Sequence, residues 1–179
     1  GCGPGTTTKA LLESPPPKLQ HVQGVDVFPQ LANYFLDVDS KNLNLNFQSE
    51  PKPKLKEKNM LVASYVINEL KNTPSWFFDY ERLMILEPST KQAFPRLLAL
   101  RDQLIEKGYD IVAPCPHHHT CPMANSKRDW CHDRVHWVQP EWFKRIENHL
   151  PIKNNTLTYS YLLASKTPID KPIFGRVVG

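Results

Sequence analysis

The chain opens on GCGPGT (residues 1–6), a glycine-rich turn that leads directly into a predicted helix over residues 6–13. In α/β proteins such a turn follows a buried strand, and its glycines let the backbone bend tightly and approach a nucleotide-like ligand. No strand precedes the turn here, so we expect a fragment, or a chain that begins one strand late. A sheet without its central first strand should be poorly stable by itself.

The composition is that of one domain of ordinary size. The 179 residues include 22 Lys and Arg against 18 Asp and Glu, four Cys, and 40% hydrophobic residues. This suffices for a core, and we find neither an apolar run of about 20 residues nor a signal-peptide pattern. Disulfide-rich, collagen-like and membrane classes are excluded. A net charge of +4 permits a nucleic-acid partner without demanding one.

Strand and helix patterns alternate after the turn. This alternation predicts an α/β fold with a mostly parallel sheet and helices on both faces. Apolar runs and period-two alternation predict strands at 21–26, 43–47, 60–66, 83–86, 109–113 and 156–164, and helical spacing predicts helices at 28–35, 97–105 and 140–150.

An acidic residue follows the turn at a spacing along the sequence that is typical of nucleotide-binding sites. Asp26 ends the predicted strand at 21–26 and lies 21 residues after Gly5. A carboxylate at this interval can accept hydrogen bonds from the hydroxyls of a ribose. The glycines do not follow the GxGxxG spacing of dinucleotide loops, and no P-loop lysine is present. The alternative is a tight turn beside a solvated acid.

Three of the four cysteines fall within one polar segment. Cys115, Cys121 and Cys131 lie within 17 residues, with the histidines of 117–119 between the first two. Clustered thiolates suit an iron–sulfur cluster or zinc, although the spacing is not the C-x2-C of a zinc ribbon. The alternative is a loop of unliganded thiols with solvated histidines.

Cations and tryptophans are interleaved around the same segment. Such a surface suits RNA, because cations neutralise phosphates and aromatic rings stack on bases. The alternative is that the tryptophans pack the segment onto the sheet and the cations are solvated. The residues are Lys127, Arg128, Arg134, Lys144 and Arg145, with Trp130, Trp137 and Trp142.

The opening turn resembles the cofactor loop of class I S-adenosylmethionine-dependent methyltransferases. In that resemblance LVASYVINEL, MILEPST, YDIVAPCP and LTYSYLLAS correspond to the fourth to seventh strands. No base or nucleophile is visible at the transfer position, where Ser-Tyr-Val-Ile-Asn-Glu replaces an N-P-P-Y-type signature. The resemblance implies S-adenosylmethionine as cofactor, held by Gly1, Gly3, Gly5 and Asp26, with Ser64 and Tyr65 facing the sulfonium.

The cysteine segment narrows the resemblance. APCPH, CPM and DWCH, with LEPST before them and TYSYLLASK after them, are similar to the small-ribosomal-subunit methyltransferase-like family of bacteria and mitochondria. The similarity spans essentially the whole chain. It implies that Cys115, Cys121 and Cys131 are ligands of a 4Fe–4S cluster, with zinc as the alternative. It also implies the small ribosomal subunit and its rRNA as partners, with the protein monomeric off the ribosome and no membrane partner.

The fourth cluster ligand departs from the family. The family's fourth cysteine lies in a C-terminal extension, and we expect that it has been truncated; His132, His117 or a water are the candidates for replacing it. Cys2 should not be the fourth ligand. It follows the position of the first strand and the other cysteines follow the sixth, and the resemblance puts these strands about four positions apart, roughly 19 Å. We therefore expect a methyltransferase-like domain at 1–113 and 151–166, a metal-binding insert at 114–150 between the last two strands, and the start of a truncated extension at 167–179.

Three functions remain open from the sequence. The first is a methyltransferase that acts on small-subunit rRNA and supports assembly and translation. The second is a catalytically silent assembly factor with the same fold. The third is a small-molecule methyltransferase with a zinc knuckle. We expect the bacterial cytoplasm, with the mitochondrial matrix as the alternative.

Overall fold

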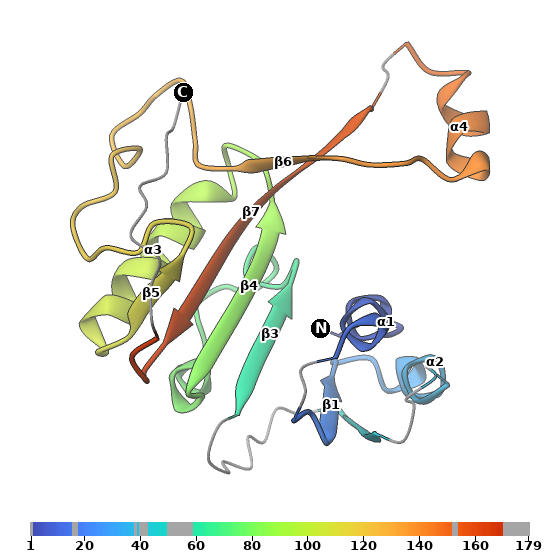
Figure 1. Ribbon diagram of the computed structural model, residues 1–179, viewed down its shortest axis with the longest axis horizontal. Coiled ribbons are helices and arrows are strands. Elements are labelled where there is room, and N and C mark those ends of the chain that lie inside the picture. Colours follow the sequence, from blue (N-terminus) through green and yellow to red (C-terminus); the bar gives the residue numbers. More distant parts are fainter. Residues whose placement is uncertain are drawn as a thin grey trace.

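The computed structural model describes residues 2–15, 18–37, 39, 43–49, 59–151 and 154–169, and all structural statements concern these residues. The described helices and strands alternate as the sequence predicts (Figure 1). In chain order they are α1 (Thr6–Glu13), β1 (His21–Val25), η1 (Pro29–Leu31), α2 (Ala32–Leu36), β2 (Asn44–Gln48), β3 (Met60–Ser64), η2 (Ser75–Asp79), β4 (Arg82–Pro88), α3 (Phe94–Glu106), β5 (Asp110–Ala113), β6 (Asp133–His136), α4 (Glu141–Glu147) and β7 (Thr156–Ser165).

The strands form two sheets. β1 and β2 pair in parallel, and the larger sheet has the order β3-β4-β7-β5, with β6 pairing with β7. β3 and β4 are parallel, but β7 is antiparallel to β4, β5 and β6. The α/β class is confirmed, whereas the mostly parallel sheet is corrected to a mixed one. Periodicity identifies a strand but not its neighbours, and β7 lies between two strands that precede it in the chain.

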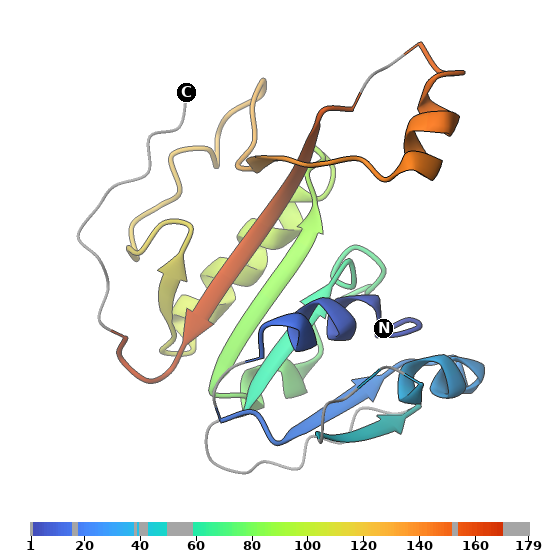
Figure 2. The same cartoon turned by 45° about the vertical axis from the view of Figure 1, so that its right-hand side comes forward.

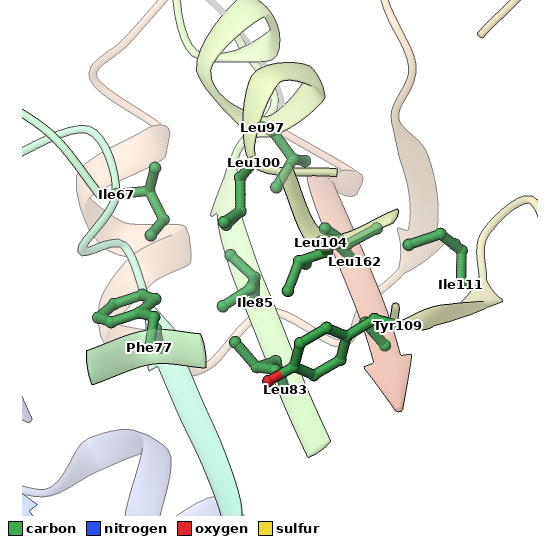
Figure 3. Packing of buried hydrophobic residues seen from close by; sticks show 12 residues of the cluster. Ile67, Phe77, Leu83, Ile85, Leu97, Leu100, Leu104, Tyr109, Ile111 and Leu162 are labelled. Carbon is green, nitrogen blue, oxygen red and sulfur yellow. The ribbon is translucent and has the colours of Figure 1, made fainter. Parts of the chain in front are cut away.

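The core lies between one face of the larger sheet and the elements α3 and η2. Leu100 and Leu104 from α3 pack towards Leu83 and Ile85 from β4, with Phe77 from η2 beside them (Figure 3). Each such buried side chain contributes about 1.5–3 kcal/mol through the hydrophobic effect. The opposite face of β4 is less completely covered, and most of the residues on that face are half-buried.

Local signals set the ends of α3. The Thr90 Oγ1 accepts a hydrogen bond from the Ala93 N–H at 3.1 Å, which satisfies a donor at the start of the helix. At the other end Gly108 has a φ of +80°. The Tyr109 N–H then donates to the Leu104 carbonyl at 3.0 Å, so the chain turns directly into β5. The helix predicted over residues 97–105 is therefore present and ends at Glu106, before Gly108.

Tyr109 closes the core beside β5, and its hydroxyl donates to the Tyr80 carbonyl at 2.5 Å. Tyr109→Phe should lower the free energy of unfolding by about 1–3 kcal/mol, because the Tyr80 carbonyl loses this donor. The Phe78 carbonyl also accepts from Tyr109, at 3.1 Å, but it keeps a second donor in the Lys166 Nζ at 2.7 Å. Denaturant unfolding of both proteins at neutral pH measures the difference.

The free energy of unfolding should depend on pH differently in the wild type and in Tyr109→Phe. Burial, with the Asp79 charge second, raises the pKa of Tyr109 from 10.0 to about 12. The folded protein therefore holds this proton where the unfolded chain loses it, and the resulting stability disappears as the pH rises from 10 towards 12. The loss should be about 1.4 kcal/mol per pH unit in the wild type. Equal pH dependence in Tyr109→Phe would contradict this account.

A long arm projects from the larger sheet. β6 and the start of β7, residues 156–158, extend beyond β4 as an antiparallel ribbon that leads to α4 at its far end (Figures 1 and 2). The predicted helix after Pro140 is present, but its apolar side does not pack into the core. Trp142 is 63% exposed, Ile146 56% and Leu150 51%, whereas Glu147 is only 4% exposed. β6 itself lies inside the predicted metal-binding insert.

Candidate functional site

The glycine-rich turn has the backbone that its sequence requires. Gly3 and Gly5 have φ values of +55° and +89°, a region that side chains disfavour. Gly5 is the N-cap residue of α1, and its carbonyl accepts from the Lys9 N–H at 2.8 Å. The predicted tight turn into a helix is therefore present. Gly1, the first predicted cofactor residue, lies outside the described residues.

Asp26 contacts this turn directly. It follows β1, is 6% exposed, and its Oδ2 accepts from the Gly3 N–H at 2.9 Å. Its Oδ1 accepts from the Phe28 N–H at 3.1 Å. The structure thus joins the predicted acid to the predicted turn. Because an ionised carboxylate has about four acceptor positions, it retains capacity for further hydroxyl donors.

Cys2 belongs to the same turn. Its N–H donates to the Val25 carbonyl at 2.7 Å, and this bond fastens the turn to the end of β1. Burial, and then the Asp26 charge, raises the pKa of the Cys2 thiol above its ordinary value. The thiol is therefore held in its neutral form at physiological pH. The turn lies on the β3 side of the larger sheet, away from β5 (Figure 1).

Ser64 and Tyr65 follow at the carboxyl end of β3. Tyr65 has a φ of +60°, unusual for a bulky residue, and its side chain is 52% exposed. Its N–H donates to the Leu86 carbonyl at 2.7 Å, which extends the β3–β4 pairing by one residue. Ligands of open α/β sheets bind outside the carboxyl ends of strands, and both residues occupy that edge.

Two residues that the sequence analysis did not single out hold the loop after Tyr65. Glu87, 1% exposed, accepts from the Ile67 N–H at 2.8 Å and from the Asn68 side-chain amide. Burial raises the pKa of the Glu87 carboxyl. Arg96 donates to the Asn68 and Leu70 carbonyls at 3.0 and 2.8 Å. The alternation of β4 was a usable signal, because it places position 87 on the buried face.

The three predicted metal ligands line one pocket. The pocket, of about 40 Å³, lies where β5, β7 and α3 meet the cysteine segment. It brings together side chains that are up to 16 residues apart in the sequence, as a shared ligand requires. Its lining consists of Phe94, Leu97, Leu98, Arg101, Ile111, Pro114, Cys115, His117, Cys121, Cys131, Tyr161 and Leu162.

The donor types that line this pocket suit two kinds of metal group. Within the described parts of the chain, no three His, Cys, Asp or Glu side chains are placed to hold a single metal ion. A zinc site requires all its donors about 2–2.3 Å from one ion. An iron–sulfur cluster spans a pocket with its own irons and takes separate thiolates around its edge. Three cysteines around one pocket fit that donor set.

Several hydrogen bonds attach the cysteine segment to the sheet. Arg101 of α3 donates from its Nη2 to the His117 and His119 carbonyls, both at 2.8 Å. The Ser160 Oγ of β7 donates to the Cys131 carbonyl at 2.8 Å. Both ends of the segment are therefore tied to regular structure. Arg101 and Ser160 were missed by the sequence analysis, because their neighbours there are distant in the chain.

The histidines have different surroundings. His117 lines the cysteine pocket, and burial, followed by the charge of Arg101, lowers its pKa. A neutral imidazole is the form that can bind a metal. His118 Nε2 lies 3.1 Å from the Asp110 Oδ1. His132 Nδ1 lies 2.9 Å from the Trp130 carbonyl. Among the histidines proposed as substitute ligands, His117 is a lining residue of the described pocket.

The predicted RNA-binding residues are all exposed but form two groups. Lys127 and Arg128 lie on the cysteine segment, while the others lie on the arm, Arg134 on β6 and Lys144 and Arg145 on α4. The Lys144 Nζ also pairs with the Glu141 Oε1 at 2.8 Å.

The tryptophans divide similarly. Trp130 is half-buried and donates to the Ser89 Oγ at 3.3 Å, so it packs the segment against the end of β4. Trp137 donates to the Asn154 carbonyl at 2.9 Å within the arm. Trp142 is the exposed member. The contact of Trp130 matches the packing alternative, whereas Trp137 is held within the arm and Trp142 is exposed.

The described residues thus define an α/β protein with a mixed sheet, a glycine-rich turn joined to a buried acid, and a pocket lined by three cysteines. The family model described as mitochondrial small ribosomal subunit Rsm22 matches residues 1–179, and the chain belongs to this family. Among curated proteins, none matches the chain. No helix in the described ranges has the length and apolarity needed to cross a bilayer.

Proposed function

We propose that this protein is an S-adenosylmethionine-dependent methyltransferase-like factor that binds the small ribosomal subunit through its rRNA and supports its assembly and translation. The family match over residues 1–179 carries the proposal, because the family's description names the mitochondrial small ribosomal subunit. It favours the mitochondrial alternative for the compartment.

The turn and the strand order support the cofactor. Asp26 accepts a hydrogen bond from the Gly3 N–H of the turn, and an ionised carboxylate has further acceptor positions that ribose hydroxyls could use. The order β3-β4-β7-β5, with β7 antiparallel, supports a class I methyltransferase sheet. In that sheet the seventh strand lies beside the fifth, and these two strands correspond to β7 and β4 here.

The cysteine pocket supports a thiolate-bound metal group, and we propose an iron–sulfur cluster, with zinc as the alternative. Cys115, Cys121 and Cys131 line the pocket together. When bound, a cluster would supply a rigid anionic anchor that ties residues 115–131 to α3 and β7. We place its role in shaping a binding surface, since the segment also carries Lys127 and Arg128.

A catalytically silent assembly factor is the second candidate. At the edge formed by β3 and β4, Ser64 and Tyr65 are the residues presented, and neither is an evident base at neutral pH. A substrate that is already nucleophilic needs no base, so the enzyme remains the first candidate. Transfer of a labelled methyl group to rRNA of purified small subunits separates the two.

Subunit binding can be assigned to the two cation groups separately. The double variants Lys127→Ala with Arg128→Ala, and Lys144→Ala with Arg145→Ala, should each weaken co-sedimentation with small ribosomal subunits. Each should also reduce the slope of log affinity against log salt by about 1–2, because phosphate contacts release counterions. Binding of naked small-subunit rRNA should fall in parallel.

The matched control removes two exposed cations elsewhere. Lys18→Ala with Lys71→Ala changes the net charge equally but lies outside both groups. It should bind nearly as the wild type does. If all three double variants weaken binding equally, attraction is a matter of net charge, and the assignment to these residues is wrong. If rRNA binding persists at moderate salt in every variant, the contacts lie elsewhere.

A further inference from the structure

Arg101 is an unusual residue for its position on α3. It is 7% exposed although it carries a permanent charge, and it lies on the face of the helix that meets the core. Its Nη1 pairs with the Asp102 Oδ1 at 2.9 Å, but that side chain is 57% exposed to solvent. Arg101 also lines the pocket of Cys115, Cys121 and Cys131.

A buried cation beside an otherwise apolar pocket calls for an anionic neighbour. Burying a charge is costly unless it is paired, and a solvated acid compensates for it only in part. The rest of the lining is mainly aliphatic and aromatic, including Phe94, Leu97 and Ile111. A positively charged occupant would be repelled here, whereas a group that several thiolates make anionic would be stabilised.

The guanidinium also sets the shape of the segment. Its Nη2 donates to two carbonyls, those of His117 and His119, both at 2.8 Å. These residues lie between Cys115 and Cys121, so one planar group holds the backbone that spaces the first two thiols. A lysine ammonium in the same place keeps the charge but lacks the fixed fork of donors.

We propose that Arg101 is the positioning residue of the cysteine pocket: it orders the turn between Cys115 and Cys121 and supplies the counter-charge for an anionic, thiolate-ligated iron–sulfur group. This inference rests on the cluster of the proposed function. The residue acts through the backbone and through its charge, and it is not itself a ligand.

The test uses the whole chain, reconstituted anaerobically with ferrous iron and sulfide. Arg101→Gln removes charge and fork, whereas Arg101→Lys keeps the charge alone. Arg96→Gln is the matched control, because Arg96 lies on the same helix and also donates to loop carbonyls, but in the loop after β3. Iron and acid-labile sulfide contents, the visible spectrum and the reduction potential are measured, with circular dichroism to verify folding.

Arg101→Gln should hold iron at least about tenfold more weakly, the size typical for groups that orient metal ligands. Its residual cluster should have a more negative potential, since a nearby cation favours the added electron. Arg101→Lys should lose iron but keep a potential near that of the wild type. Arg96→Gln should match the wild type in both measurements. A merely structural role would change loading without moving the potential.

The two ways of failing are distinct. If the wild type takes up no iron and sulfide, the cluster of the proposed function is wrong, and the role of Arg101 is wrong with it. If the wild type loads and folded Arg101→Gln loads equally with the same potential, only the role of Arg101 is wrong. Should Arg101→Gln fail to fold, Arg101→Lys decides: loading equal to the wild type would overturn the positioning role.

Discussion

Cys131→Ser is expected to abolish the bound iron and sulfide of the purified protein. Cys131 lines the pocket with Cys115 and Cys121, and a serine hydroxyl does not ionise near neutral pH to replace the thiolate. The substitution is nearly isosteric, and the Ser160 hydrogen bond goes to the backbone carbonyl, so the fold should be retained. Iron and sulfide analysis after anaerobic purification, with the visible spectrum, measures the effect.

Cys2→Ser provides the control for this experiment. Cys2 is the remaining cysteine of the chain and belongs to the turn before α1, fastened to β1. It should leave the iron and sulfide contents unchanged. Iron loss in Cys2→Ser as severe as in Cys131→Ser would show that the cluster is not in the pocket beside α3. Zinc without sulfide in the wild type would favour the small-molecule methyltransferase alternative.

Asp26→Ala is expected to weaken S-adenosylmethionine binding by about a hundredfold or more. The variant loses the acceptor proposed for the ribose, and it leaves the Gly3 and Phe28 N–H groups without their carboxylate partner. Hydrogen bonds to a charged group contribute about 1.5–3 kcal/mol each, and about 1.4 kcal/mol corresponds to a tenfold change in affinity. Calorimetry with S-adenosylmethionine or its demethylated product measures the change.

The matched control is Asp37→Ala, which removes an exposed acid after α2. It should bind the cofactor as the wild type does. Unchanged affinity in Asp26→Ala would leave the turn and its acid with a structural role only. The same variant also separates the two candidate functions. If Asp26→Ala still binds small subunits and supports their assembly without binding cofactor, the assembly-factor alternative replaces the enzyme.

Most elements could be predicted because their signals are local. The helix over residues 6–13 and the strand that ends before Asp26 occur where periodicity and turn chemistry place them. The stop at Gly108 follows from a backbone that only glycine adopts readily. The joint position of the turn and Asp26 was also predictable, because a β-α-β connection brings those two points of the chain together.

Pairing partners could not be predicted in the same way. The period of two shows that residues 156–164 form a strand, but it does not show that this strand lies between β4 and β5. The sequence of β6 is too short and too polar to predict a strand by itself. It forms a strand because β7 pairs with it. On α4, the apolar side seen in the sequence is exposed, because the arm carries the helix away from the core.

By its own residues, the sequence determined the α/β class, the turn with its acid, and the three cysteines as a group, since each depends on residue type and spacing along the chain. Only the tertiary structure decided what surrounds them: Arg101 behind the cysteine pocket, Glu87 beneath the loop after β3, and the division of the cations into two groups. These are contacts between residues far apart in the chain. A buried charge is stable only where neighbouring groups compensate for it, and the order of the strands determines which groups are its neighbours.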